Sequence, residues 1–437
     1  MEKLEYEGNV KNVLLDPVLD VKNQRSEFRL NNDDASRVIL SSLRLSGYGV
    51  TATGAPHYNF VAGAAGIIKN IFLMDGNVVL DKCVNANGWA AFKNYLDFND
   101  DNASKTKPLY RHNMGYMVDG VSPKDDVLTA TDAPRTDVLY RTANGSITGA
   151  QDSLQNAGYL DLKMLLPMLG AVDILPLSVF QRLRIVIEYE SDANKFLSNT
   201  GNPSTTIRPV LSFDELTDPE EKMMATSSFG STTWLSIEHD LVVVPSQSPA
   251  AVANTRASQT INANVKNFRG KYLQKMVVAK NPVDTGVFKL GNVCSPMGAH
   301  ASVTSIDEKM NVKINGAPKL PLDCDRPNKR LALLQETWGV ANSYPLSSDH
   351  GSDRNYYILA QFDGSTDRKR QVAVQDYFGL SIEDTVRDME LKFERTVEGS
   401  AAGSNEQYVS QLNLNMWGLC RKSIVMGSGG KYSVVYA

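Results

Sequence analysis

The sequence has little excess charge of either sign and no concentration of basic residues. It contains 45 lysine and arginine residues against 49 aspartate and glutamate residues, which gives a net charge of −4. The longest basic run is the triplet Arg368-Lys369-Arg370, and no basic tail stands at either end. Proteins that follow a phosphate backbone carry a basic stripe or patch. We therefore expect no direct binding of nucleic acid.

Long apolar runs and closely spaced cysteines are also missing. No stretch of about 18 apolar residues is present, so we expect no transmembrane helix. The polar start, MEKLEYEGNVKNV, is unlike a secretory signal peptide. The cysteines are far apart and form no C-x-x-C pair, which predicts free, mostly buried thiols in a reducing compartment. They are Cys83, Cys294, Cys324 and Cys420.

Motifs of nucleophilic catalysis, zinc binding and phosphate binding are absent. Neither G-x-S-x-G nor H-E-x-x-H occurs. The stretch GSGGK at 427–431 partly matches a phosphate-binding loop, but Val425 stands where that motif needs glycine and Tyr432 where it needs serine or threonine. The stretch also leads into a strand pattern and not into a helix. We interpret it as the turn of a hairpin.

Histidines are few and scattered, and no two are close enough in sequence to form a local pair of metal ligands. They are His57, His112, His239, His300 and His350. The segment DHGSD around His350 lacks the ligand spacing of a calcium loop. His239, in an alternating segment, is predicted to be a hydrogen-bonded strand residue. We therefore expect no enzymatic activity, no cofactor and no metal site, although paired carboxylates of a glycosidase would meet only in the fold.

A module occurs twice in the chain, at 70–98 and at 311–338. Each copy has an apolar strand, a turn pair suited to a tight hairpin, a Leu-Asp pair with a nearby cysteine, and an amphipathic helix pattern. Asp323 follows Asp81 at an offset of 242 residues (323 − 81). The turn pairs are Asp75-Gly76 and Asn315-Gly316. A duplicated unit is the simplest interpretation.

The 437 residues, of which 42% are hydrophobic, read as about eight short strands in each half, with short helices in the connections. This pattern predicts an all-β chain of two consecutive eight-stranded jelly rolls. We predict an N-terminal arm at 1–25, a first jelly roll at 26–228 and a second at 229–437. The polar segment 99–155 is predicted to be a long surface loop. Helices are expected at about 86–97, at 218–225 behind Asp218-Pro219, and behind Asp325 with Pro327 in the first turn.

Several stretches, taken in order, resemble one known family. They are GIIKNI at 66–71 with the Asp75-Gly76 turn and Leu80-Asp81, LPLS at 175–178 before LRI at 183–185, the segment 234–245 with its IEHD, Asn315-Gly316, and YSVVY at 432–436. The chain resembles the double jelly-roll major capsid proteins of polinton-like viruses, virophages, large nucleocytoplasmic DNA viruses and adenovirus-like viruses. The resemblance extends from about residue 26 to residue 437. The arm at 1–25 and the loop at 99–155 match nothing in it.

The resemblance implies a structural subunit of a virion. Three chains would form a homotrimer with a pseudo-hexameric outline, and such capsomers would tile an icosahedral capsid assembled inside the host cell. Implied partners are neighbouring capsomers and minor capsid and penton proteins. In this lineage a membrane or another layer often separates shell from genome, in line with the missing basic arm.

Two other interpretations compete with the capsid subunit. A carbohydrate-binding or carbohydrate-active β-sandwich would grip sugars with surface aromatic residues, but most of the tryptophans lie in core-like strand or helix patterns. The candidates are Trp89, Trp234, Trp338 and Trp417. A minor capsid or penton protein is usually a single jelly roll, and the doubled length disfavours it.

Overall fold

The structure is a computed structural model of the whole chain. The residues that it describes are 10–31, 34–46, 50–51, 57–58, 63–97, 160–191, 197–198, 204–205, 209–246, 256–282, 307–320, 327–338, 378–398, 411–427 and 431–436. The predicted loop at 99–155 and the segment around His350 lie outside these residues, and so do two stretches, 355–362 and 371–374, whose sequence predicts strands. So do Cys294, Asp323 and Cys324.

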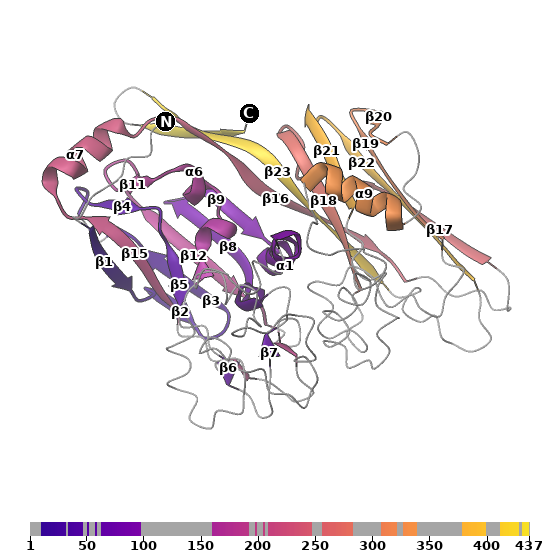
Figure 1. The fold of residues 1–437 in the computed structure, drawn as a ribbon, viewed down its shortest axis with the longest axis horizontal. Coiled ribbons are helices and arrows are strands. Elements are labelled where there is room, and N and C mark those ends of the chain that lie inside the picture. The colour runs from indigo at the N-terminus through magenta and orange to yellow at the C-terminus, as the bar shows by residue number, and fades with distance from the viewer. Residues whose placement is uncertain are drawn as a thin grey trace, which may run out of the picture.

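Two antiparallel sheets form the first half (Figure 1). One sheet is centred on β15, whose two edges are paired by β1 and by the successive segments β4 and β5. Beyond these lie β10 and β11. Its strands are β1 (Val10–Leu15), β4 (Val38–Leu40), β5 (Arg44–Ser46), β10 (Leu160–Asp161), β11 (Ile174–Pro176) and β15 (Val210–Leu216).

The second sheet of this half has the order β2-β3-β12-β8-β9. In β12, Leu183, Ile185 and Ile187 are fully buried, as the period of two in the sequence predicts. Its strands are β2 (Leu19–Val21), β3 (Arg25–Arg29), β8 (Ile68–Asp75), β9 (Val78–Val84) and β12 (Leu183–Tyr189). The segment 1–25, which we expected as an arm, thus contributes β1 to one sheet and β2 to the other.

The second half repeats the arrangement with two further antiparallel sheets (Figure 1). One sheet has the order β16-β23-β18-β21, with β24 paired to β23, and the other has the order β17-β22-β19-β20. The first consists of β16 (Thr232–Val244), β18 (Tyr272–Pro282), β21 (Phe378–Thr385), β23 (Leu412–Met426) and β24 (Tyr432–Tyr436). The second consists of β17 (Arg256–Asn264), β19 (Asp307–Ile314), β20 (Ala317–Pro318) and β22 (Met389–Glu398).

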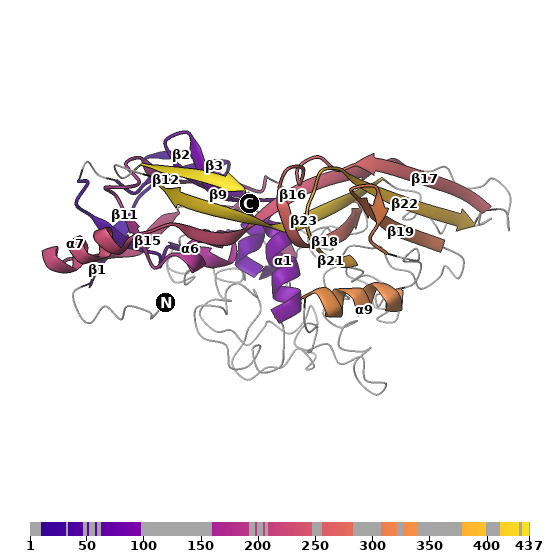
Figure 2. The same ribbon diagram turned by 90° about the horizontal axis from the view of Figure 1, so that it is seen from above.

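The two copies of the predicted module share one order of elements. In the first, β8 and β9 form a hairpin that leads into α1 (Ala86–Asp97); in the second, β19 and β20 form a hairpin that precedes α9 (Pro327–Trp338). Asn315 and Gly316 both have a positive φ, as a two-residue turn of this kind requires, whereas in the first copy the positive φ is that of Gly76. The shared order is confirmed, and α1 and α9 lie on the same side of the sheets in Figure 2.

The helix predicted behind Asp218 is confirmed at its start. The side chain of Asp218 accepts hydrogen bonds from the backbone N–H groups of Glu220 and Glu221, and α7 begins at Pro219. Its end at Ser228 lies beyond the predicted end at 225. The Ser228 hydroxyl donates to the Ala225 carbonyl and helps to satisfy the last turn.

One strand prediction was wrong and one strand was missed. The apolar pattern at 37–45 predicts a single strand, but the structure interrupts it between β4 and β5, because the backbone of Ser41 turns aside to donate to the Asp173 carbonyl. Strand β21, FGLSIEDT, was not predicted at all, because its alternation is short and begins next to a glycine.

Short elements complete the described part of the chain. They are β6 (Val50–Thr51), β7 (His57–Tyr58), β13 (Leu197–Ser198), β14 (Ser204–Thr205), α6 (Met168–Ala171) and two 3-10 turns, Gly63–Ile67 and Leu162–Met164. β13 pairs with β7 and β14 with β6 in small ribbons. α6 lies in the first half in Figure 1 and contributes to its junction with the second half.

Candidate functional site: the junction of the two halves

The sheet that contains β16, β18 and β23 is buried on both faces in its middle part. In β23 the adjacent residues Met416 and Trp417, which point to opposite faces, are 0% and 1% exposed. Met416 packs in the core of the second half, and Trp417 packs in the core that includes the first half. Val277 and Val278 of β18 divide in the same way. The two halves are therefore joined through a shared hydrophobic layer.

The long strands β16 and β23 carry this layer across the molecule (Figure 1). They pair along their whole length, from Thr232 opposite Ile424 to Val244 opposite Leu412. Trp234 of β16 packs in the core of the first half, whereas Val244 at the other end packs in the core of the second. A single continuous ribbon is thus common to both halves.

Helices α1 and α9, the equivalent helices of the two module copies, contact each other through aromatic rings. The ring centroid of Trp338 lies 5.9 Å from that of Trp89 and 5.0 Å from that of Phe92, both in edge-to-face geometry. Such pairs stabilise by about 0.5–1.5 kcal/mol beyond their burial. The module that the sequence repeats thus supplies one side of the junction.

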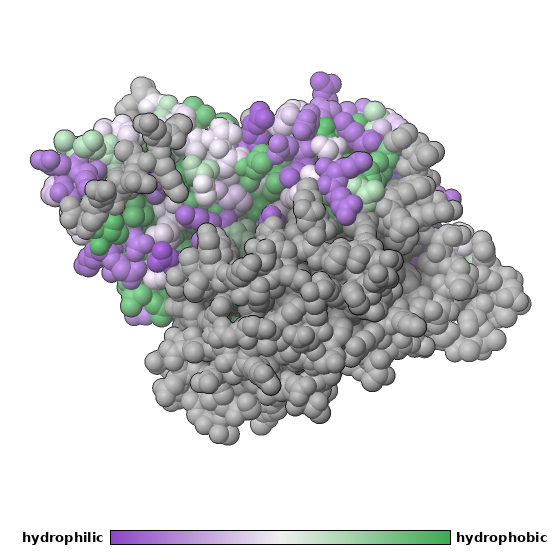
Figure 3. All heavy atoms as spheres, viewed as in Figure 1, coloured by the Kyte–Doolittle hydropathy of each residue, from purple (hydrophilic) through white to green (hydrophobic). Residues whose placement is uncertain are grey.

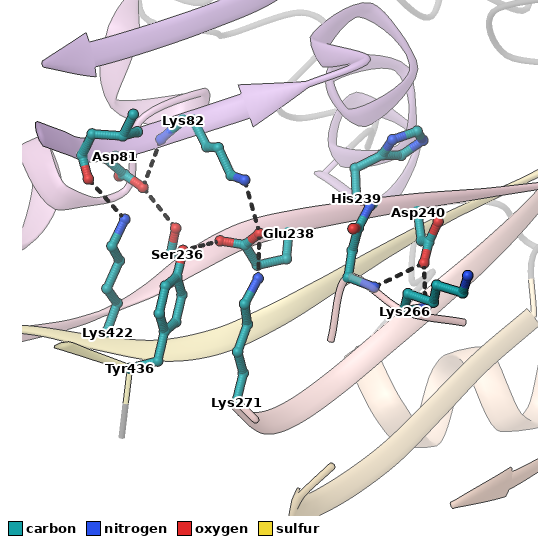
Figure 4. A network of polar contacts seen from close by, with 12 residues as sticks. Asp81, Lys82, Ser236, Glu238, His239, Asp240, Lys266, Lys271, Lys422 and Tyr436 are labelled. Atoms are coloured by element: carbon teal, nitrogen blue, oxygen red, sulfur yellow. Dashed lines mark hydrogen bonds and ion pairs between the residues drawn. The ribbon is translucent and has the colours of Figure 1, made fainter. Parts of the chain in front are cut away.

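A fully buried carboxylate, Asp81 of β9, marks the centre of the junction (Figure 4). Its Oδ2 accepts from the backbone N–H of Met168 at 2.8 Å, and its Oδ1 accepts from the Ser236 hydroxyl at 2.8 Å and from the Lys82 N–H at 3.0 Å. Burial raises the pKa of Asp81, although these three donors oppose the rise. Asp81 thereby ties α6 and β9 of the first half to β16.

A second buried carboxylate, Glu238 of β16, is 1% exposed and binds cations from both halves (Figure 4). Its Oε2 lies 3.2 Å from Nζ of Lys82 and 2.9 Å from Nζ of Lys271, and its Oε1 accepts from the Tyr436 hydroxyl at 2.6 Å. Burial opposes ionisation of Glu238, but Lys82, Lys271 and Tyr436 outweigh it and lower the pKa of the carboxyl group. Glu238 is ionised and connects β9, β24 and the start of β18.

Lys422 of β23 is 2% exposed and points towards the first half. Its Nζ donates to the Val79 carbonyl at 3.2 Å and lies 5.0 Å from the ring centroid of Tyr436. Burial lowers the pKa of Lys422, and Asp81 and Glu238 oppose that change. This lysine therefore ties the outer end of β23 to the hairpin of the first module copy.

A chain of amides and one imidazole bridges the halves near α1. Oδ1 of Asn415 accepts from Nδ2 of Asn85 at 2.9 Å and lies 3.0 Å from Nε2 of His239. Because an amide oxygen only accepts, Nε2 of His239 carries the hydrogen. Burial lowers the pKa of His239, against the effects of Asn415 and Asp240. The prediction of a satisfied strand histidine is confirmed.

The four tryptophans do not present a sugar-binding surface. Trp89, Trp234 and Trp417 are 3%, 4% and 1% exposed. The indole N–H of Trp338 donates to the Met276 carbonyl, and Nζ of Lys275 lies 4.3 Å from its ring centroid. Three of these rings are thus buried in the cores, and the partly buried Trp338 packs against α1 and Lys275.

Two of the four cysteines and the strands beside the glycine-rich stretch at 427–431 also lie in the described part of the chain. Cys83 and Cys420 are buried and free, as predicted, and burial raises the pKa of both thiols, that of Cys420 to about 12. β23 and β24, on either side of the stretch predicted to be a hairpin turn, pair antiparallel, whereas 428–430 lie outside the described residues. Among the described residues there is no group of three or more metal-ligating side chains and no helix that is long and apolar enough to span a membrane.

Sequence reasoning did not identify Asp81, Glu238 or Lys422 as junction residues. Asp81 was singled out only as an anchor of the repeat. The available signal was a charged residue inside an apolar strand, such as Glu238 in WLSIEHDLVVV, since charged residues are seldom fully buried without a partner. What this set of residues can do is mechanical: it holds two sandwiches in one fixed relation.

The fold is similar to those of virus-particle proteins. No protein-family model and no curated protein match the sequence. PBCV-1 VP54, in the crystal structure fitted into a cryo-EM reconstruction of the virophage Sputnik, matches with a TM-score of 0.54 at 13% identity, over 100% of this chain and 99% of VP54. A chain of the 3.5 Å cryo-EM structure of the Sputnik virophage matches with a TM-score of 0.50 at 11% identity, over 100% and 90% of the two chains.

The mavirus major capsid protein is a further match, with a TM-score of 0.48 at 8% identity over 100% of this chain and 92% of that one. The paired sheets in each half and the full-length likeness to VP54 establish that the chain is an all-β double jelly roll. The predicted fold class is therefore confirmed.

Proposed function

We propose that the chain is a major capsid protein, the repeating structural subunit of an icosahedral virion. The observation that carries the proposal is the full-length likeness in fold to VP54, which was fitted into a virophage reconstruction. The likeness to a chain of the Sputnik virophage structure, which covers 100% of this chain and 90% of that one, supports the same role. Both likenesses span the two halves, as a shared building block requires.

The junction supports this role physically. A shell subunit must keep its shape when it contacts its neighbours. A hinge between the two sandwiches would let their relative orientation change. Here the middle part of the sheet of β16, β18 and β23 is buried on both faces, and two buried carboxylates make contacts across the boundary. We propose the first jelly roll at 26–228 and the second at 229–437, and the expected arm at 1–25 adds β1 and β2 to the two sheets of the first.

Two similar halves in one rigid subunit suit a trimer. Three copies around a threefold axis present six similar sides and can occupy a sixfold position in a shell. We propose a homotrimeric, pseudo-hexameric capsomer that contacts its neighbours and the minor capsid and penton proteins of the particle. An internal membrane would be a further partner, as the resemblance to the double jelly-roll major capsid proteins implies.

Exposed apolar side chains support association of the chain with further copies. Leu14 of β1 and Met223 of α7 are both 70% exposed, and Met224 is 65% exposed. On the face shown in Figure 3, hydrophobic residues occur in small groups between hydrophilic ones. Contacts between copies of a capsid subunit would cover such groups and remove them from water.

The experiment is a mass measurement on the purified chain by light scattering, followed by negative-stain imaging. We expect a trimer with a pseudo-hexagonal outline, because an obligate assembly buries on the order of 2,000 Å² or more. A monodisperse monomer at concentrations of tens of micromolar would contradict the proposal. No observation in the described residues favours the carbohydrate-binding alternative, and soluble oligosaccharides should leave the mass and the thermal stability unchanged.

A further inference from the structure

Strand β24 is held on one edge by β23 and has two different faces. Its residues pair antiparallel with those of β23, from Tyr432 opposite Met426 to Tyr436 opposite Lys422. Tyr432, Val434 and Tyr436 are partly buried, whereas Ser433 and Val435 between them are exposed. In the described part of the chain no strand pairs with its other edge. The side chains of its inner face must therefore supply the rest of its attachment.

At one end of β24, Tyr432 contacts the first half. Its hydroxyl donates to Oδ2 of Asp75, the last residue of β8, at 2.6 Å. Its ring lies 5.2 Å from that of Phe180, which is fully buried and packs in turn on Phe229 at 5.5 Å. Val434 also packs against the core that includes the first half. The side chains at this end of the strand therefore pack mainly against the first jelly roll.

At the other end, Tyr436 completes the environment of Glu238. Its hydroxyl donates to Oε1 of Glu238 at 2.6 Å, and its ring lies 4.6 Å from Nζ of Lys271 and 5.0 Å from Nζ of Lys422. Glu238 binds Lys82 of the first half through its other oxygen. The aromatic ring thus shields a buried charge network that crosses the boundary (Figure 4).

We propose that β24 is a latch over the junction. Its inner face, which carries Tyr432, Val434 and Tyr436, occupies a strand-binding site built by both halves. Release of β24 opens that end of the junction while the rest of the second half stays folded. Where β23 ends and β24 begins, the Gly427 N–H donates to the Lys431 carbonyl. The latch is independent of the capsid role, because it concerns the two halves of one chain.

The first test uses the intact chain and hydrogen exchange measured by mass spectrometry. In the double variant Tyr432→Phe, Tyr436→Phe, both hydroxyl donors are lost while the rings remain. We expect exchange in 68–84 and 232–239 to accelerate about tenfold or more, because each lost bond was made to a carboxylate. Exchange in β17 and β22 should not change.

The matched control replaces the outer face of the same strand, Ser433→Ala with Val435→Ala, and should leave exchange at the junction unchanged. The proposal is overturned if the tyrosine variant accelerates exchange in β24 alone, throughout the molecule, or no more than the control does. Light scattering on the same samples reports the oligomeric state separately, so failure of the latch and failure of the capsid role are distinguishable.

The second test examines the site itself. A variant that ends at Gly427 leaves the site vacant, and the synthetic peptide KYSVVYA is added in trans. We expect the peptide to bind and to restore slow exchange in 68–84, whereas a peptide with alanine at both tyrosine positions should do neither. Equal binding of the two peptides, or binding without restored protection, would refute a specific strand-binding site. If this variant does not fold, the tyrosine variants of the intact chain decide.

Discussion

Gly88 in α1 lies against the indole of Trp417 in β23, so closely that a Cβ atom at position 88 would be 2.7 Å from Cζ2 of the ring. The first residue belongs to the first jelly roll and the second to the strand that both halves share. The indole N–H donates to the Val84 carbonyl at 3.3 Å and so fixes the ring in place. The absence of a side chain at position 88 is what allows the two halves to approach so closely at this contact.

The substitution Gly88→Ala should therefore destabilise the protein. The added methyl group must displace a buried indole from its hydrogen bond, and overpacking of this kind costs about 1–3 kcal/mol. The free energy of unfolding, measured by denaturant titration, should fall by that amount. Gly170→Ala in α6 is the control, because a Cβ there has no atom within 4 Å. Equal stability of the two variants would show that the contact at Gly88 is not tight.

Replacement of Asp81 by asparagine should also destabilise the junction. Both carboxylate oxygens of Asp81 accept hydrogen bonds, so the NH2 group of an asparagine would face a donor in either orientation. One buried donor left without a partner costs about 1–3 kcal/mol. The exposed Asp173→Asn, with the same change of charge, should have an effect within about 0.5 kcal/mol. Thermal unfolding of both variants at pH 7 tests this, and an unchanged D81N would contradict it.

Glu238→Gln should cost about 2–3 kcal/mol, because it leaves the ammonium groups of Lys82 and Lys271 without their anion. Lys82 keeps part of its side chain in water, which moderates the loss. Glu394→Gln is the matched control: Glu394 pairs with Lys392 at 2.8 Å on the surface, and such a pair contributes about 0–1 kcal/mol. A loss at Glu238 no larger than that at Glu394 would be inconsistent with a buried hub.

The Glu238 effect should depend on pH in a direction that its pKa fixes. The folded protein lowers the pKa of Glu238 below the ordinary value of 4.5. Its stabilisation is therefore present above about pH 4.5 and is lost as the pH falls through the folded pKa. The difference in unfolding free energy between the native chain and E238Q should therefore become smaller as the pH falls from about 4.5 through the folded pKa of Glu238. A difference that stays constant from pH 7 to pH 3 would contradict the assignment.

His239 should make the junction sensitive to mild acid. Burial lowers its pKa below the ordinary 6.5, so protons bind more readily to the unfolded chain. Stability should therefore decline as the pH falls below about 6.5, until the folded histidine titrates as well. In His239→Gln this part of the pH dependence should disappear, as measured by unfolding free energy at half-unit steps. A native-like slope between pH 6.5 and pH 5 in H239Q would assign the dependence to another group.

Much of the fold was predictable because strands and turns are local. The alternation of Leu183, Ile185 and Ile187 with the residues between them indicated strand β12, and Asp218-Pro219 indicated the start of α7. The turn at Asn315-Gly316 was predictable because both residues tolerate a positive φ. The break between β4 and β5 was not predictable, because it depends on a hydrogen bond from Ser41 to the distant Asp173.

The sequence by itself determined that two sandwiches would form, since alternation and turn chemistry act within a few residues. Only the tertiary structure decided that one sheet would serve both cores, because the alternation of Met416 and Trp417 does not specify which apolar surface each side meets. The junction carboxylates follow the same rule. Asp81 and Ser236 lie 155 residues apart and meet at 2.8 Å, and the burial that gives this contact its strength exists only after the halves have packed.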